Sequence, residues 1–229
     1  MSCIYTENSM MLSSVSLENI PYLWEQNDIL IFLIDLDDYD ILNQEYLNNI
    51  EKEHLEKLKT IYFKKRYIVS RVVLKHVLCR LLNKKSIMDV STYKDEYGEV
   101  HILNHKELHI CLSYSESIVT LAISRVELGI DVEVIRPLAL KNILKYLQTK
   151  PSYIDKSLSG IDLLKTWTIK EAYCKFSNTS IFSVLGKEPD YNNICYSIYI
   201  LDNKYTFSVV TDSDPYTINI SQLEKIDYN

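Results

Sequence analysis

The stretch Gly129-Ile130-Asp131-Val132-Glu133 is one of two that decide the fold and the chemistry predicted from this sequence. Apolar and acidic residues alternate in it, which is typical of a β-strand. Side chains two residues apart on a strand point the same way, so Asp131 and Glu133 share one face. Taken alone, such a pair of acidic residues usually lies on the solvent-exposed face of a half-buried strand. Gly129 precedes it, where we expect the backbone to pass close to a ligand.

The second stretch is Trp167-Thr168-Ile169-Lys170-Glu171-Ala172-Tyr173-Cys174-Lys175. As a helix it places Trp167, Glu171 and Lys175 on one stripe, at spacing i, i+4, i+8. The ordinary alternative is a surface helix, in which an i, i+4 pair of Glu171 and Lys175 contributes about 0.2–0.5 kcal/mol. Together the two stretches offer three carboxylates and two lysines. That set is suited to holding a hard cation such as Mg²⁺ against a phosphate ester.

The composition is that of a globular protein without a basic excess. The chain has 229 residues, 47% hydrophobic and 24% charged, enough for one larger domain or two smaller ones. Its formal charge of −6 argues against general nucleic-acid binding. The five cysteines include no CxxC pair, which argues against zinc and a disulfide framework and favours a reducing cytoplasm. We expect no signal peptide and no membrane-spanning segment.

The order of predicted elements indicates an α+β fold. Residues 1–27 are polar and form either an ordered cap or a loose leader. The expected strands are 29–36, 108–112, 118–124, 129–135, 194–201, 205–211 and 216–220, and the expected helices are two stretches within 42–82, then 138–147 and 161–177. This order hints at two similar halves, 1–128 and 129–229. The basic residues of 61–82 are either an ordinary solvated helix face or part of a binding site.

The motifs GIDVE and WTIKEAYCK resemble the signature of the Sfp-type 4′-phosphopantetheinyl transferase family. Members of that family move 4′-phosphopantetheine from coenzyme A to a serine of an apo carrier protein and release adenosine 3′,5′-bisphosphate. The resemblance implies two related α+β halves, arranged with a pseudo-two-fold relation, with the active site between them. It also implies a Mg²⁺ ion held by Asp131, Glu133 and Glu171.

The resemblance assigns further residues to coenzyme A and to the reaction. Lys59, Arg66 and Arg71 fall where the family binds the 3′-phosphate, and a guanidinium suits that group. Tyr97 and Gly98 match the turn at the adenine, Ser113 and Tyr114 the segment at the pyrophosphate, and Lys170 and Lys175 the charges that balance the phosphates. We expect Glu171 to accept the proton of the attacking serine, directly or through a water. Glu171 and Lys175 are thus the predicted catalytic residues.

Three positions depart from the pattern of the family. Glu99 and Val100 stand where a Lys-Pro pair is usual, which removes a positive charge near the phosphates. Tyr114 replaces a histidine and donates only a neutral hydrogen bond. At residues 149–151 the chain lacks an acid that many members carry.

The sequence therefore predicts a Mg²⁺-dependent cytoplasmic transferase, monomeric, with coenzyme A and a fatty-acid, polyketide or nonribosomal-peptide carrier as partners. Two alternatives stay open at this point. One is a catalytically weakened homologue that binds coenzyme A or a carrier protein, and the other is an unrelated Mg²⁺ phosphotransferase or nuclease. We expect Asp131 and Glu171 to be partly exposed.

Overall fold

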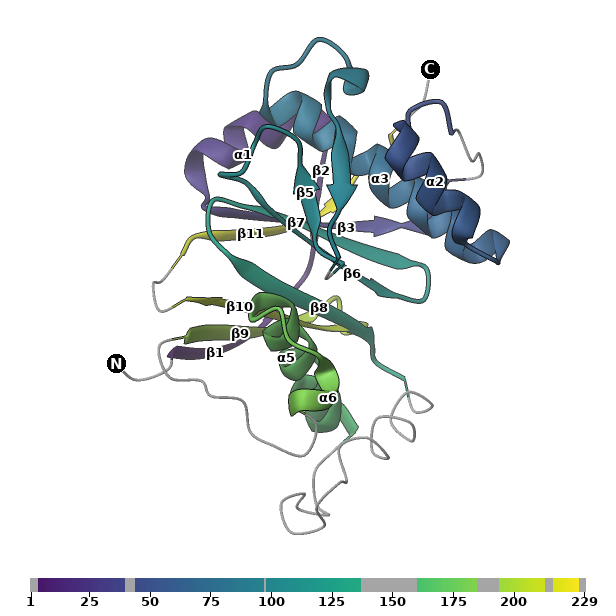
Figure 1. Cartoon of the computed structure of the whole chain (residues 1–229). Helices are drawn as coiled ribbons and strands as arrows, with labels where there is room; N and C mark the ends of the chain where they lie inside the picture. Colours follow the sequence, from purple (N-terminus) through teal and green to yellow (C-terminus); the bar gives the residue numbers. More distant parts are fainter. Residues whose placement is uncertain are drawn as a thin grey trace. The chain divides into compact units, whose positions relative to one another are not determined.

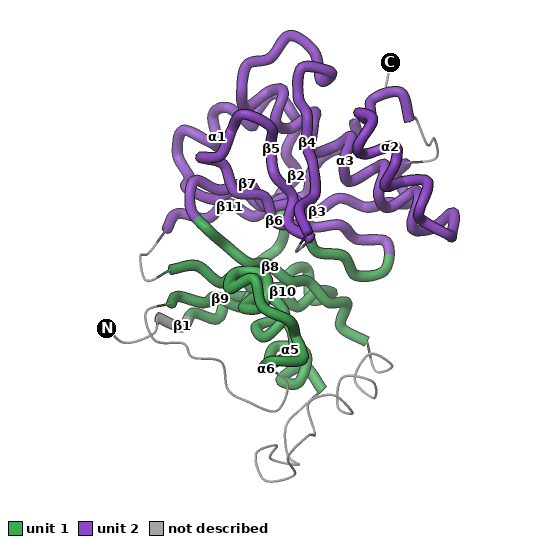
Figure 2. Tube along the Cα trace, in the orientation of Figure 1, with its two compact units in different colours: residues 1–12, 113–116, 127–215 green, residues 13–112, 117–126, 216–229 purple. Residues whose placement is uncertain are grey.

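The chain folds into two compact units, each assembled from separate segments. The computed structural model describes residues 4–39, 44–96, 98–136, 160–184, 194–212 and 216–226. Unit 1 comprises Met1–Leu12, Ser113–Glu116 and Glu127–Pro215, and unit 2 comprises Ser13–Leu112, Ser117–Val126 and Tyr216–Asn229 (Figure 2). The chain therefore passes between the units several times.

Unit 1 is built on a four-stranded sheet of order β1-β9-β10-β8 (Figure 1). Its strands are β1 (Ile4–Met10), β8 (Leu128–Val134), β9 (Ile194–Leu201) and β10 (Tyr205–Asp212). β10 is antiparallel to β8 and β9, and β1 is parallel to β9. Helix α5 (Gly160–Phe176) packs against β8 and β10 and is followed by the short helix α6 (Ile181–Val184). Helix α5 thus packs on β8, and this contact places the two sequence motifs side by side.

Unit 2 contains most of a seven-stranded sheet of order β2-β11-β3-β7-β6-β5-β4. The strands are β2 (Ser13–Val15), β3 (Ile29–Asp35), β4 (Thr92–Lys94), β5 (Val100–Ile102), β6 (His109–Ser115), β7 (Ile118–Ser124) and β11 (Ile218–Leu223). The last three residues of β6 belong to unit 1. Six of the seven residues of β3 are buried, as expected for a continuous apolar run in a sheet covered on both faces.

Three α-helices belong to unit 2: α1 (Ile20–Gln26), α2 (Asn49–Lys57) and α3 (Ile61–Leu81). Short 3₁₀ turns cover Leu17–Asn19, Leu36–Asp38 and Ile87–Asp89. A capping box between Asn48 and Glu51 begins α2, and Thr60 caps α3. Leu47 and Leu55 pack against Ile68 and Val72 and hold α2 against α3.

The architecture is α+β with two sheets, as the element order predicts. Of the two alternatives for residues 1–27, the ordered one is found over the part described: β1, β2 and α1 lie there, and β1 pairs with β9. The expected helix 138–147 lies outside the described residues. The similarity of two halves that meet near residue 128 stays a prediction. No helix in the described ranges has the length and apolar character needed to cross a bilayer.

Gly129 is required by helix packing, and the expectation of a ligand near its backbone stays a prediction. A Cβ at this position would lie 1.9 Å from the carbonyl oxygen of Ala172 and 2.6 Å from the backbone nitrogen of Phe176. Both atoms belong to α5, so the absence of a side chain lets the helix backbone lie directly on β8. Ala172 is itself fully buried and packs with Val210 of β10.

Gly129→Ala should therefore destabilise the protein, because α5 must move off β8 to make room for the methyl group. We expect a loss of about 3 kcal/mol in the free energy of unfolding, the upper part of the range for overpacked cores. Urea denaturation of the variant and the unchanged protein measures it. Unchanged stability would contradict this close contact.

Candidate functional site

Asp131 lies at the junction of three segments of unit 1. It is buried on β8, with 6% of its surface exposed. Its Oδ1 accepts hydrogen bonds from the Ser113 hydroxyl of β6, at 2.7 Å, and from Nζ of Lys175 on α5, at 2.9 Å. Lys175 also donates to the carbonyl oxygen of Ile130. The expectation that Asp131 is partly exposed is wrong, because α5 and β6 cover it.

The second carboxylate oxygen of Asp131 differs from the first in its contacts. Oδ2 is buried and has no hydrogen-bond partner among the described residues. A buried carboxylate oxygen without a partner is costly, because it has lost its hydration. A divalent cation is one group that would satisfy it, since hard cations take carboxylate oxygens as ligands.

Glu133 is held by a pair of contacts similar to those of Asp131. The Ser115 hydroxyl donates to Oε2 of Glu133 at 2.8 Å, and the indole of Trp167 also hydrogen-bonds this side chain. Burial and the neighbouring charge of Asp131 raise the pKa of Glu133, while Ser115, Lys175 and Trp167 lower it to a smaller extent. The ionised form of Glu133 is thus disfavoured, but it is surrounded by donors.

Ser113 and Ser115 explain why the two acids are spaced two residues apart. Each serine hydroxyl accepts the backbone N–H of a β8 residue, Val132 or Val134, and donates to the carboxylate of the residue before it. Two residues on β6 therefore match two residues on β8, the repeat of a strand. Ser113 was predicted only as a contact of coenzyme A, and Ser115 was not predicted.

Glu171 completes the cluster from α5. Burial raises the pKa of Glu171 from 4.5 to about 7, and the charge of Asp131 adds to this, whereas Lys175 lowers the value and Glu133 raises it again. The stripe of Trp167, Glu171 and Lys175 thus faces the two acids of β8, as the helical spacing predicts. At neutral pH the cluster carries more negative charge than one ammonium balances.

The carboxylate oxygens of this cluster are suitable ligands for a divalent cation, but the three carboxylates do not lie close together. Among the described residues, the group of three acidic or histidine side chains whose ligand atoms all lie within 4.8 Å is Asp95, Glu99 and His101. Those residues lie at the β4–β5 turn of unit 2, where His101 Nε2 lies 2.9 Å from an Asp95 oxygen. An ordinary ion pair accounts for that group. Within the ranges described, Asp131, Glu133 and Glu171 do not form such a group.

Two other predicted residues of unit 1 are placed differently. Lys170 is buried on α5, and its Nζ donates to the carbonyl oxygen of Val184 in α6 at 3.3 Å. This hydrogen bond directs the ammonium of Lys170 to α6. Tyr114 lies between the two serines on β6 and is half-buried.

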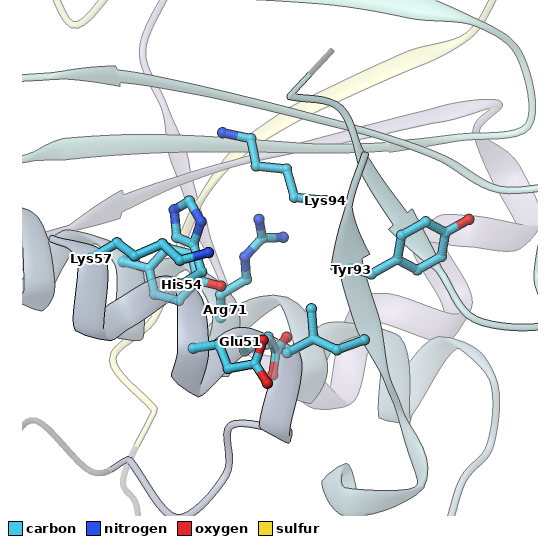
Figure 3. A pocket seen from close by; sticks show the side chains of 9 residues that line it. Glu51, His54, Lys57, Arg71, Tyr93 and Lys94 are labelled. Carbon is cyan, nitrogen blue, oxygen red and sulfur yellow. The ribbon is translucent and has the colours of Figure 1, made fainter. Parts of the chain in front are cut away.

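Unit 2 holds a separate hollow of about 170 Å³ with a basic lining (Figure 3). Arg71 of α3 contributes to it, together with His54 and Lys57 of α2 and Lys94 of β4. Arg71 is only 3% exposed, and its Nε and Nη1 have no hydrogen-bond partner in the part of the chain that the structure describes. Its guanidinium lies 5.3 Å from the Tyr67 ring centroid. Burial lowers the pKa of His54, and the charges of Lys94, Arg71 and Lys57 lower it further.

The alternative of a solvated basic face on α3 is wrong for two of its residues. Arg71 and Lys75 are both buried, because α2 and β4 cover that side of the helix. A buried guanidinium without a partner is expensive, and a phosphate is the anion that its planar fork fits best. The hollow is therefore a candidate phosphate site.

The other residues predicted for coenzyme A do not line this hollow. Lys59 is exposed between α2 and α3, and Arg66 lies 4.9 Å from the Phe63 ring centroid. Gly98 has a positive φ of 96°, which favours glycine at this turn, while Tyr97 lies outside the described residues, as do 149–151. Sequence reasoning missed His54, Lys57 and Lys94, because each is an ordinary polar residue without a motif.

Comparison with known proteins supports a relationship at a distance. Over 191 residues the chain is 27% identical to the 4′-phosphopantetheinyl transferase Sfp of Bacillus subtilis (strain 168), an alignment that covers 73% of this chain and 84% of that protein. A scan against models of protein families found no match. The similarity suggests a transferase related to the phosphopantetheinyl transferases.

The raised pKa of Glu171 predicts how stability without divalent cations depends on pH. Because the folded value is about 7 and the ordinary value 4.5, the folded state binds the extra proton between these pH values, and stability falls as pH rises through them. Glu171→Gln removes this loss. The variant should melt several degrees above the unchanged protein at pH 8, and this advantage should disappear below pH 4.5.

Melting curves in chelator at several pH values measure the difference. The matched control is Glu18→Gln, which removes an exposed acid paired with Arg80 in unit 2. A Glu171→Gln protein less stable than the unchanged protein at pH 8 would contradict the electrostatic account.

Proposed function

We propose that this protein transfers 4′-phosphopantetheine from coenzyme A to a serine of an apo carrier protein and releases adenosine 3′,5′-bisphosphate. The observation that carries the proposal is the cluster of Asp131, Glu133, Glu171 and Lys175, set in place by two serines and a tryptophan. The similarity to Sfp supports the same reaction class. A pseudo-two-fold arrangement of two halves belongs to this proposal.

Asp131, Glu133 and Glu171 would hold a Mg²⁺ ion. The unpartnered Oδ2 of Asp131 and the raised pKa values of Glu133 and Glu171 are the features that a divalent cation would relieve. When bound, such an ion neutralises charge on the pyrophosphate of coenzyme A and orients it. Ser113, Ser115 and Trp167 hydrogen-bond to Asp131 or Glu133 and so hold these two carboxylates in place without the ion.

The residues of α5 have separate tasks in the transfer. Lys175 lies beside Asp131 and would offer positive charge to the phosphates. Glu171 is the carboxylate that α5 brings to the cluster, and a carboxylate can act as a general base. We propose that it accepts the proton of the carrier serine, whose oxygen forms the new bond to the β-phosphorus. The bond from that phosphorus to the bridging oxygen breaks, and the oxygen leaves with adenosine 3′,5′-bisphosphate.

The basic hollow of unit 2 is proposed to bind the 3′-phosphate of coenzyme A. Arg71 supplies a guanidinium whose Nε and Nη1 have no partner among the described residues. Lys57, Lys94 and, when protonated, His54 add positive charge around it. A phosphate monoester would therefore replace lost hydration at the guanidinium and balance the charge of the lining.

A weakened homologue is the second candidate, and two residues favour it. Tyr114 carries no positive charge where the family has a histidine, and Glu99 brings an acid near His101, at 3.9 Å. Both changes reduce the positive charge available to phosphates. Such a protein would bind coenzyme A without transferring its phosphopantetheine.

The transfer is tested by the intact mass of apo carrier proteins incubated with this protein, coenzyme A and Mg²⁺. We expect a gain of one phosphopantetheine on at least one fatty-acid, polyketide or peptide carrier, lost in chelator. Asp131→Asn should reduce the rate at least a hundredfold, because it removes a full charge from the cluster, and Glu18→Gln should leave it unchanged.

No mass gain with any carrier, while coenzyme A still raises the melting temperature, would replace the transferase by the binding protein. If coenzyme A gives neither a mass gain nor a thermal shift, the proposed function is wrong. Full activity of Asp131→Asn would remove Asp131 from the proposed metal ligands.

A further inference from the structure

A buried ion pair lies one helical turn from Arg71 in unit 2. Lys75 and Glu51 are 1% and 2% exposed, and Nζ of Lys75 lies 2.6 Å from Oε2 of Glu51. Lys75 also donates to the carbonyl oxygen of Tyr46 at 2.7 Å. Two charges so deeply buried are rare in proteins and costly unless every oxygen and proton finds a partner.

Both carboxylate oxygens of Glu51 are occupied. Oε2 accepts from Lys75 and from the backbone N–H of Asn48 at 2.8 Å, and Oε1 accepts from the hydroxyl of Thr92. Asn48 also donates its side-chain amide to the carbonyl oxygen of Thr92. The network therefore fixes the Glu51 carboxylate between α2, α3 and β4, the three elements that line the basic hollow.

Glu51 and Arg71 line the same hollow, yet no ion pair joins them. Lys75 follows Arg71 by four residues on α3, so the two side chains lie on one stripe of the helix. A buried guanidinium beside a buried carboxylate would ordinarily form a bidentate pair, which is stronger than the bond of carboxylate to a single ammonium. Among the described residues, Glu51 instead pairs with Lys75, and Nε and Nη1 of Arg71 remain without partners.

A pair of Glu51 with Arg71 would neutralise the guanidinium. The guanidinium would then offer fewer donors, and the carboxylate would repel any phosphate that approached. Glu53, the other carboxylate of the lining, is exposed to solvent, where its charge is screened. Anion binding in the hollow therefore depends on whether the Glu51 carboxylate pairs with Lys75 or with Arg71.

We propose that Lys75 is a positioning residue that withholds Glu51 from Arg71 and so keeps the guanidinium open to a phosphate monoester. Lys75 itself does not touch the ligand. The proposal rests on the proposed function, because it deepens the assignment of the hollow to the 3′-phosphate of coenzyme A.

The test compares the affinity of three variants for adenosine 3′,5′-bisphosphate by calorimetry at one pH. In Lys75→Met, Glu51 loses its cation and turns to Arg71, so we expect at least a tenfold weaker affinity. In Lys75→Met with Glu51→Gln, the competing charge is also gone, and affinity should return to within about threefold of the unchanged protein. The amide oxygen that Glu51→Gln introduces can still accept from Asn48 or Thr92, which preserves the fold. Arg71→Gln should lose at least tenfold.

A purely structural role of Lys75 predicts that the double variant binds no better than the single one, and this result would overturn the proposal. Unchanged affinity of a folded Lys75→Met protein would overturn it equally. If the single variant does not fold, the double variant decides: affinity near that of the unchanged protein supports the proposal, and a tenfold loss contradicts it. Unchanged binding by Arg71→Gln would instead overturn the 3′-phosphate site of the proposed function.

Discussion

One oxygen atom, Oδ1 of Asp131, joins the three segments on which unit 1 depends. It accepts from Ser113 on β6 and Lys175 on α5, while Asp131 itself is part of β8. The contact is possible because Gly129 lets α5 lie directly on β8. It also leaves Oδ2 buried without a partner in the described part of the unit. The arrangement that holds α5, β6 and β8 together is therefore also the one in which we propose that a cation binds.

Each unit contains charges that the side chains described around them do not balance. Unit 1 gathers Asp131, Glu133 and Glu171 around one ammonium, and the pKa of Glu171 rises to about 7 as a result of burial and of these neighbours. Unit 2 gathers cations around Arg71, while Lys75 neutralises the nearest buried acid. Such imbalance costs stability and persists where a ligand offsets it. The proposed ligands, a divalent cation and a phosphate, have charges opposite to those of the two clusters.

The features that could be predicted from the sequence are those that follow from local periodicity. The apolar run of β3, the shared face of Asp131 and Glu133, and the stripe of α5 all result from the repeat of a strand or helix. Periodicity could not predict which basic residues of α3 are buried, because Arg71 and Lys75 are covered by α2 and β4, which lie elsewhere in the sequence. The pairing of β1 with β9 and the role of Ser115 likewise depend on contacts between distant segments.

We propose that Asp131, Glu133 and Glu171 together hold a divalent cation. The release of protons when Mg²⁺ binds tests this proposal most directly. Titration of the metal-free protein with Mg²⁺ by calorimetry, in buffers of different ionisation enthalpy, counts the protons. Because the pKa values of Glu171 and Glu133 are both raised, binding should release more protons at pH 6 than at pH 8.5. Glu171→Gln should lose most of the release at pH 6 and bind more weakly. Equal affinity and equal release in that variant would contradict the account.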